Sequence, residues 1–121
     1  MKYLLDTHVF IWYLEGNNRL KPEWRHIIAD RKNDVFVSIT SPWEMSLKAK
    51  KLHLQLPFDS YFRNFEYMLL TITLPHIDEL RKLPFHHKDP FDRMLVAQAR
   101  VEGCMLITLD KKMLAYDVPI L

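Results

Sequence analysis

The sequence has little cysteine and glycine, no marked excess of either charge and no long apolar run. Its single cysteine, Cys104, excludes a disulfide within the chain and is typical of a reducing compartment. Two glycines and 49% apolar residues argue against a disordered chain. No apolar stretch approaches the ~20 residues that span a membrane, and Asp6 interrupts the first apolar run too early for a signal peptide. We therefore expect a cytoplasmic globular protein without a membrane segment.

Length and charge balance favour one globular domain but do not identify its partner. At 121 residues the chain is long enough to bury a core of its own, and we expect a single domain over residues 1–121. Its 17 basic and 15 acidic residues give a formal charge of +2. A nucleic acid partner is therefore neither required nor excluded, and local clusters of charge must decide.

Short, continuously apolar runs alternate with segments of helical periodicity along the chain. Strands are predicted at 2–5, 35–39, 71–74 and 105–109, with a final one near 118–121. Helices are predicted at 7–16, 20–33, 41–51, 58–70, 75–83, 90–103 and 111–116. Such alternation predicts an α/β fold with a mainly parallel central sheet of four to five short strands flanked by helices.

Residues 87–94 contain the best-defined helix start in the chain. Asp89 has the side chain of an N-cap residue, and Pro90 follows at the first helical position, where its missing N–H costs nothing. Asp92 then lies in the first turn, beside free backbone N–H groups and the positive end of the helix dipole. We expect Asp89 to cap this helix and Asp92 to be held ionised.

Three further acids occupy comparable junctions between predicted strands and helices. Asp6 and Asp110 end apolar runs, and Glu44 lies in the first turn of the helix after the second strand. The carboxyl ends of parallel strands and the adjoining helix starts share one edge of an α/β sheet, where ligands bind. We therefore expect Asp6, Glu44, Asp92 and Asp110 to converge in one cleft.

Convergent carboxylates predict a cation site. Two carboxylates about 4 Å apart repel each other by ~4 kcal/mol at an effective dielectric constant of 20. A hard ion such as Mg²⁺ or Mn²⁺ offsets that cost, and one or two such ions supply the chemistry of phosphoryl transfer. No histidine or cysteine pair has zinc spacing, so Zn²⁺ is disfavoured.

Each acid taken alone has a simpler explanation. Ser41 to Glu44 has the sequence of a capping box, in which the Glu44 side chain accepts from the Ser41 N–H. Asp6 and Asp110 have the sequence positions of N-caps. The recurrence of acids at four equivalent junctions is what favours a site. Asp6 is the strongest single case, because an acid directly after a buried strand has little structural need.

These segments, in this order, resemble the motifs of the PIN-domain ribonucleases, in particular the VapC-type toxins of bacterial and archaeal toxin–antitoxin systems. The resemblance spans the full length and is carried by Tyr3-Leu4-Leu5-Asp6-Thr7-His8, Ser41-Pro42-Trp43-Glu44 with Lys48, His86-His87-Lys88-Asp89-Pro90-Phe91-Asp92-Arg93 with Ala97-Gln98-Ala99, and Thr108-Leu109-Asp110. It implies a PIN fold and Mg²⁺- or Mn²⁺-dependent endoribonuclease activity. The implied catalytic and metal-binding set is Asp6, Glu44, Asp92 and Asp110.

The resemblance also implies protein partners: a cognate antitoxin that folds onto the toxin and blocks the cleft, and a second copy in a homodimer. Many relatives have Asn or Ser where this chain has His8, so the resemblance assigns no role to His8. An aromatic run independently suggests a protein-binding surface and comprises Tyr61, Phe62, Phe65 and Tyr67.

A second tier of residues flanks the four acids and comprises Asp89, Thr7, Thr108, Lys48, Arg93 and Lys111. Asp89 is one turn from Asp92 and within reach of a metal-bound water, and the two threonines are placed to orient ligands. Lys48 is spaced for an i,i+4 ion pair with Glu44, or for phosphate contact.

Arg93 is expected to be solvated or ion-paired, although its guanidinium also suits phosphate. Lys111, with Lys112, is the basic pair most expected to meet RNA phosphates. His86 and His87 read as an exposed pair in the loop before the helix, or alternatively as contacts to the RNA backbone.

Two alternatives to a ribonuclease remain open. A PIN-like module with a degenerate site would bind RNA or protein without cleaving it. A phosphoaspartyl phosphatase would use Asp6 as its nucleophile. Phosphatases of that kind need a second Asp two residues later, where this chain has His8.

Overall fold

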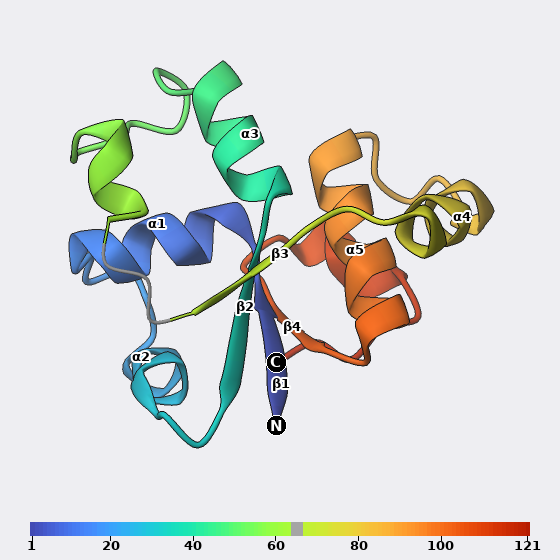
Figure 1. Cartoon of the computed structure of the whole chain (residues 1–121), viewed down its shortest axis with the longest axis horizontal. Helices are drawn as coiled ribbons and strands as arrows, with labels where there is room; N and C mark the ends of the chain where they lie inside the picture. Colours follow the sequence, from blue (N-terminus) through green and yellow to red (C-terminus); the bar gives the residue numbers. More distant parts are fainter. Residues whose placement is uncertain (64–66) are drawn as a thin grey trace.

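The computed structural model describes residues 1–63 and 67–121, with a sheet of four strands at its centre (Figure 1). The strands are β1 (Lys2–Leu5), β2 (Asp34–Ser38), β3 (Met68–Leu70) and β4 (Met105–Ile107), in the order β3-β2-β1-β4. All three pairings are parallel. The predicted α/β class with a parallel sheet is therefore confirmed.

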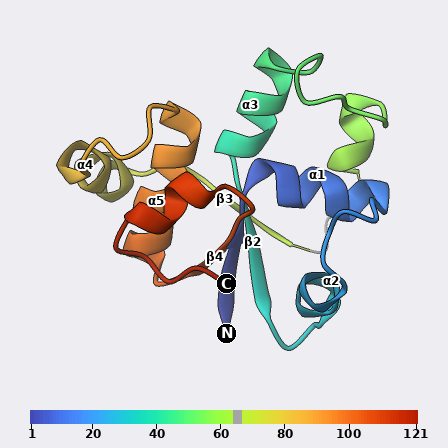
Figure 2. The same cartoon turned by 180° about the vertical axis from the view of Figure 1, so that it is seen from behind.

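Helices cover both faces of the sheet, which Figures 1 and 2 show from opposite sides. One face carries α1 (Thr7–Glu15) and α2 (Pro22–Ala29), and the other carries α4 (Leu74–Lys82) and α5 (Pro90–Glu102). The remaining helices are α3 (Thr40–Leu47) and two 3-10 helices, η1 (Phe58–Tyr61) and η2 (Lys111–Ala115). In the part of the chain that the structure describes, no helix is long and apolar enough to cross a membrane.

The two faces of the sheet have separate apolar cores. Leu5 packs with Phe10 and Val37 on one face, whereas its neighbour Leu4 packs with Leu95 and Leu106 on the other. Successive side chains of a strand point to opposite faces, so a strand covered on both sides must be apolar throughout. This explains why the strands appear in the sequence as unbroken apolar runs.

The helix predicted at 58–70 is wrong. Only Phe58–Tyr61 is helical, as the 3-10 helix η1, and Met68–Leu70 forms β3 at the edge of the sheet. The third strand thus precedes its predicted position at 71–74. Part of the predicted helix, 64–66, lies outside the described residues. Helical periodicity was misleading here because strand pairing depends on a distant segment, residues 36–38 of β2.

The aromatic run is also not the exposed partner surface that we expected. Tyr61 and Tyr67 are buried in the core, where the Tyr67 ring lies edge-on to Phe10 at 5.3 Å. Phe62 is half-buried against the same core, and Phe65 lies outside the described residues. The final strand predicted near 118–121 is reduced to one bridge, from Ile120 to Leu106.

The capping box predicted at Ser41 to Glu44 is absent. α3 begins one residue earlier, at Thr40, and its N-cap residue is Ile39, which has no side-chain acceptor. The Ser41 hydroxyl instead lies 3.0 Å from the Thr7 hydroxyl of α1. Because Glu44 does not cap its helix, the simplest structural explanation for this acid fails.

Candidate functional site

The order of the strands places Asp6 at the switch point of the sheet, where the chain stops adding strands on one side of β1 and adds the next on the other. The chain builds β2 and β3 on one side of β1 and then returns to add β4 on the other side. Asp6 follows β1, and its N–H donates to the carbonyl of Ile107 at the end of β4 (3.0 Å). In open α/β sheets this carboxyl-end switch point is where ligands bind.

A cavity of about 240 Å³ lies at this edge. We call it the acidic cavity, and its lining includes Asp6, Glu44, Asp89, Asp92, Asp110, Lys48 and His87. The four acids predicted to converge therefore do so, although they come from four different junctions of the chain. Asp89 adds a fifth carboxylate to the same walls.

Asp6 is buried and held by groups from both ends of the chain. One carboxylate oxygen accepts from the Val9 N–H (2.8 Å), so Asp6 is the N-cap of α1. The other accepts from the Thr108 hydroxyl, which in turn accepts from the Asp110 N–H (3.0 Å). Burial raises the pKa of Asp6 despite these hydrogen bonds. Thr108 thus links two of the acids, as the sequence suggested.

The sequence correctly predicted how α5 begins but not how Asp92 titrates. The Asp89 carboxylate accepts from the N–H groups of Phe91 (2.8 Å) and Asp92 (3.4 Å), as an N-cap does. Without an ion, the helix terminus does not keep the pKa of Asp92 low. Burial, together with the carboxylates of Asp89, Asp6 and Glu44, raises the pKa of Asp92 to about 7. Convergence of the acids outweighs the helix dipole.

His87 is the site residue that sequence reasoning missed. It is 8% exposed rather than solvated, and its Nε2 lies 2.8 Å from Oδ2 of Asp110 and 3.0 Å from Oδ2 of Asp92. Its Nδ1 accepts from the Asp89 N–H (3.2 Å), so the ring proton that contacts the two carboxylates is on Nε2. His87 therefore bridges two acids, where a cation would also lie. Its neighbour His86 remains exposed.

Lys48 forms the predicted i,i+4 ion pair and a second one that the sequence did not predict. Its Nζ lies 3.2 Å from Oε2 of Glu44 and 3.1 Å from Oδ2 of Asp89. Burial lowers the pKa of Lys48, but the two carboxylates raise it by more. The same ammonium group and the backbone N–H groups of α5 hold the pKa of Asp89 low in spite of its burial. Lys48 thus joins α3 to the start of α5.

Arg93 points away from the acidic cavity, contrary to expectation. It is buried, and its guanidinium donates to the carbonyl of Pro84 (2.8 Å) and to the Tyr116 hydroxyl (3.2 Å). The same hydroxyl accepts from the His87 N–H (3.0 Å). Arg93 therefore anchors the loop that carries His87. Lys111 is exposed and does not line the acidic cavity, whereas Thr7 does.

One oxygen in the acidic cavity has no protein partner. Oε1 of Glu44 is buried and accepts no hydrogen bond from any residue that the structure describes. A buried carboxylate oxygen without a donor is costly unless a ligand completes it. Together with the raised pKa values of Asp6 and Asp92, it marks a site in which carboxylates outnumber the cationic side chains.

Comparisons with known proteins agree with this fold. The sequence profile of the PIN domain matches residues 3–119. A crystal structure of VapBC2 from Rickettsia felis, bound to a DNA fragment from its promoter, contains a chain with 16% identity and a TM-score of 0.73, covering 99% of this chain and 96% of that one. No curated protein gives a significant match.

Two further structures have similar folds. FitAB bound to the IR36 DNA fragment gives 18% identity and a TM-score of 0.66, covering 98% of this chain and 93% of that one. FitAcB from Neisseria gonorrhoeae gives 20% identity and a TM-score of 0.62, covering 98% and 95%. At these identities the likeness concerns the fold alone.

Proposed function

The chain belongs to the PIN-domain family, and on this premise we propose that it is a Mg²⁺- or Mn²⁺-dependent endoribonuclease. The observation that carries the proposal is the convergence of Asp6, Glu44, Asp92 and Asp110 in the acidic cavity, at the switch point of the sheet. We further propose that residues 1–121 act as one cytoplasmic domain.

The residues of the acidic cavity fit a hard divalent ion. Asp6, Glu44, Asp92 and Asp110 would hold one or two ions, and their ligand atoms are carboxylate oxygens, which Mg²⁺ and Mn²⁺ prefer. Donor atoms of Asp92, Asp110 and His87 lie within 4.8 Å of one another. The unpartnered Oε1 of Glu44 and the raised pKa of Asp92 support the same assignment.

When bound, such ions supply a water of lowered pKa and positive charge for the leaving oxygen. The chain's own residues position the ligands. Thr108 orients Asp6, His87 holds Asp92 and Asp110 together, and Lys48 fixes Glu44. No serine or cysteine is among the described residues that line the acidic cavity, and the Thr7 hydroxyl there is hydrogen-bonded to Ser41, which favours water as the nucleophile.

We also propose that the ribonuclease is a toxin restrained by a cognate antitoxin, and that it forms a homodimer. The VapC-like motifs and the similarity of the fold to VapBC2 support an antitoxin. A second support is an apolar hollow of about 430 Å³ beside α3, lined by Met45, Ala49, Leu54, Leu56 and Phe58 among others. Leu56 and Phe58 are exposed there, as expected of a surface that a protein covers.

The central experiment measures cleavage of a labelled single-stranded RNA by the purified chain. We expect cleavage with Mg²⁺ or Mn²⁺ and none in EDTA. Asp6→Asn should abolish cleavage while it retains RNA binding, because Asn still caps α1. The matched control is Asp34→Asn, which neutralises an exposed acid at the opposite end of the sheet. Unchanged cleavage in EDTA, or by the Asp6→Asn variant, would contradict the mechanism.

The same measurements separate the alternatives. A non-catalytic binding module would bind RNA without cleaving it under any metal condition. A phosphoaspartyl phosphatase would release phosphate from small phosphate esters and trap a phosphoryl group on Asp6. Calorimetric titration with Mn²⁺ provides a readout independent of activity, since Asp92→Asn and Glu44→Gln should each weaken ion binding.

A further inference from the structure

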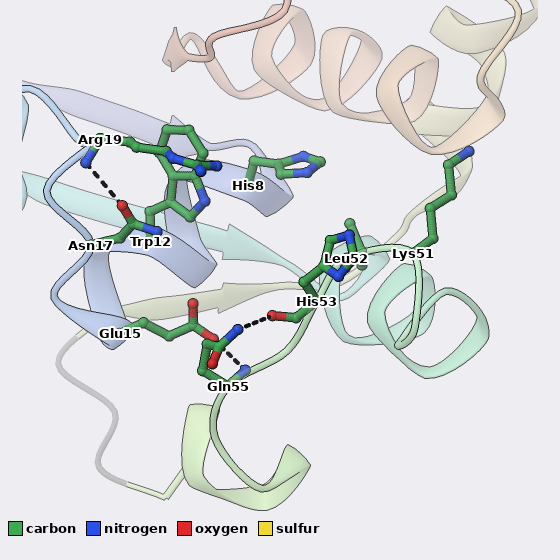
Figure 3. A pocket seen from close by; sticks show the side chains of 9 residues that line it. All are labelled: His8, Trp12, Glu15, Asn17, Arg19, Lys51, Leu52, His53 and Gln55. Carbon is green, nitrogen blue, oxygen red and sulfur yellow. Dashed lines mark hydrogen bonds between the residues drawn. The ribbon is translucent and has the colours of Figure 1, made fainter.

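A second cavity of about 650 Å³, whose lining side chains are drawn in Figure 3, shares part of its lining with the acidic cavity. We call it the outer cavity, and its lining comprises His8, Trp12, Glu15, Asn17, Arg19, Lys51, Leu52, His53 and Gln55. His8, Lys51 and Leu52 line both cavities. A flexible chain that passes over the acids can therefore continue into the outer cavity across these residues.

Cationic side chains outnumber carboxylates in the outer cavity, whereas carboxylates outnumber cationic side chains in the acidic cavity. Arg19 and Lys51 have no carboxylate partner within residues 1–63 and 67–121. The carboxylate in the lining, Glu15, already accepts from the Tyr61 hydroxyl and from the Gln55 N–H (2.8 Å). Two uncompensated cations are thus available to an anion in this cavity.

The outer cavity also presents flat groups on which a ring can stack. Trp12 is half-buried, and the Arg19 guanidinium lies over its ring at 5.8 Å from the centroid. The His8 ring stands edge-on to Trp12, with centroids 6.4 Å apart (Figure 3). Aromatic and guanidinium planes beside cations are the elements with which proteins bind single-stranded nucleic acid.

The loop after α3 is held in an unusual conformation that forms one wall of the outer cavity. His53 has a φ of 51°, a left-handed conformation that non-glycine residues rarely adopt. Its carbonyl accepts from the Gln55 side chain (3.1 Å), and the Gln55 N–H is held by Tyr61 (3.1 Å). Surrounding contacts thus maintain a strained turn between Lys51 and Gln55, as is frequent where a ligand binds.

We propose that the outer cavity binds a nucleotide of single-stranded RNA next to the phosphodiester that is cleaved. Its base stacks against Trp12 and Arg19, and its phosphate contacts Lys51. The proposal extends the ribonuclease function and rests on it. The cations favour a polyanion over a peptide, and stacking requires an unpaired base, which excludes an RNA duplex.

The test is binding of a fluorescein-labelled ten-nucleotide single-stranded RNA, measured by anisotropy in EDTA so that cleavage does not interfere. Trp12→Leu should weaken binding by about 5- to 150-fold, the range measured when one stacked base loses its aromatic partner. Trp12→Phe keeps an aromatic ring and should bind within a few-fold of the wild type. Circular dichroism and thermal unfolding identify any variant that fails to fold.

Lys51→Gln tests the phosphate contact, and Lys50→Gln is its control because Lys50 is the exposed neighbour that lines neither cavity. Lys51→Gln should make the slope of log Kobs against log salt shallower by about 0.7, whereas Lys50→Gln should leave it unchanged. An oligomer of the same length with abasic sites tests the base itself, since Trp12→Leu should then have no effect.

Equal RNA affinity for wild type, Trp12→Leu and Lys51→Gln would overturn the nucleotide subsite and leave the outer cavity as a protein contact. An equal loss on the abasic oligomer would overturn stacking. Failure of the ribonuclease function is a different result, because the chain would then bind RNA through the outer cavity but not cleave it with Mg²⁺ or Mn²⁺.

Discussion

The acidic cavity and the outer cavity share part of their lining but have opposite balances of charge. In the acidic cavity, five carboxylates lie close together and outnumber the lysines that line it, Lys48 and Lys51. In the outer cavity, Arg19 and Lys51 form no ion pair with any residue that the structure describes. A polyanion accompanied by a divalent cation compensates both at once. This contrast is consistent with the proposed RNA substrate and divalent ion, which carry charges of the two required signs.

The largest effect is expected when one carboxylate of the acidic cavity is neutralised. Asp92→Asn should lower RNA cleavage by about 10²- to 10³-fold or more, as loss of a key charge-stabilising group does. The metal-free variant should nevertheless be at least as stable as the wild type, because it removes a carboxylate whose neighbours repel it. Cleavage rates and urea unfolding in EDTA measure the two effects. A marked loss of stability would mean that Asp92 serves the fold rather than the site.

Acidic pH should act on the acidic cavity through Asp92. Since the pKa of Asp92 is raised to about 7, an ion must displace a proton below that pH. Affinity for Mn²⁺ should therefore fall by about tenfold per pH unit below 7, for one proton released per ion. Titration calorimetry between pH 5 and pH 8, on the order of half-unit steps, measures the slope. A flat profile would contradict the prediction.

The raised pKa of Asp92 also makes the stability of the metal-free chain depend on pH. The folded chain keeps a proton on Asp92 between its ordinary pKa of 3.8 and the raised value of about 7, whereas the unfolded chain has lost it. The free energy of unfolding contributed by this group is therefore highest below the ordinary pKa and is lost as pH rises through the raised one. Urea unfolding in EDTA across this range should show the decline, and saturating Mn²⁺ should reverse it.

His87 tests how far a hydrogen-bond donor between Asp92 and Asp110 stabilises the acidic cavity. His87→Ala removes the contacts to Asp92 and Asp110 and should lower metal-free stability by about 2 kcal/mol. Saturating Mn²⁺ should restore part of this loss, because an ion would contact the same two carboxylates. His86→Ala is the control, since it removes a ring of the same loop that packs on Tyr116 and has no ion pair with either acid among the described residues. Equal losses with and without Mn²⁺ would show that His87 only anchors its loop.

The smallest effect on stability is expected from the ion pair between Asp89 and Lys48. Asp89→Asn keeps the cap of α5 but loses the charge of the ion pair, and should cost at most about 0.5–1 kcal/mol because the pair is partly exposed. Asp89→Ala should cost about 1 kcal/mol more through loss of the cap. Thermal unfolding should show Asp89→Ala to be less stable than Asp89→Asn. If Asp89→Asn were the less stable variant, the charge of Asp89 would matter more than its cap.

Much of the fold was predictable because its signals are local. The apolar runs gave β1 and β2, Pro90 and Asp89 gave the start of α5, and Gly16, with a φ of 65°, ends α1 as expected. Errors arose where pairing or packing decides. Met68–Leu70 becomes a strand through its pairing with β2. α3 begins at Thr40, and the Ser41 hydroxyl bonds to Thr7 instead of capping the helix.

By itself, the sequence determined the α/β class and the four acids that converge, because strand, helix and junction follow from residue type and order. Only the tertiary structure decided which groups surround those acids. It buries His87 between Asp92 and Asp110, turns Arg93 away and places the outer cavity beside the site. Burial, charge proximity and pKa depend on distances between residues far apart in the chain, and local sequence patterns do not contain those distances.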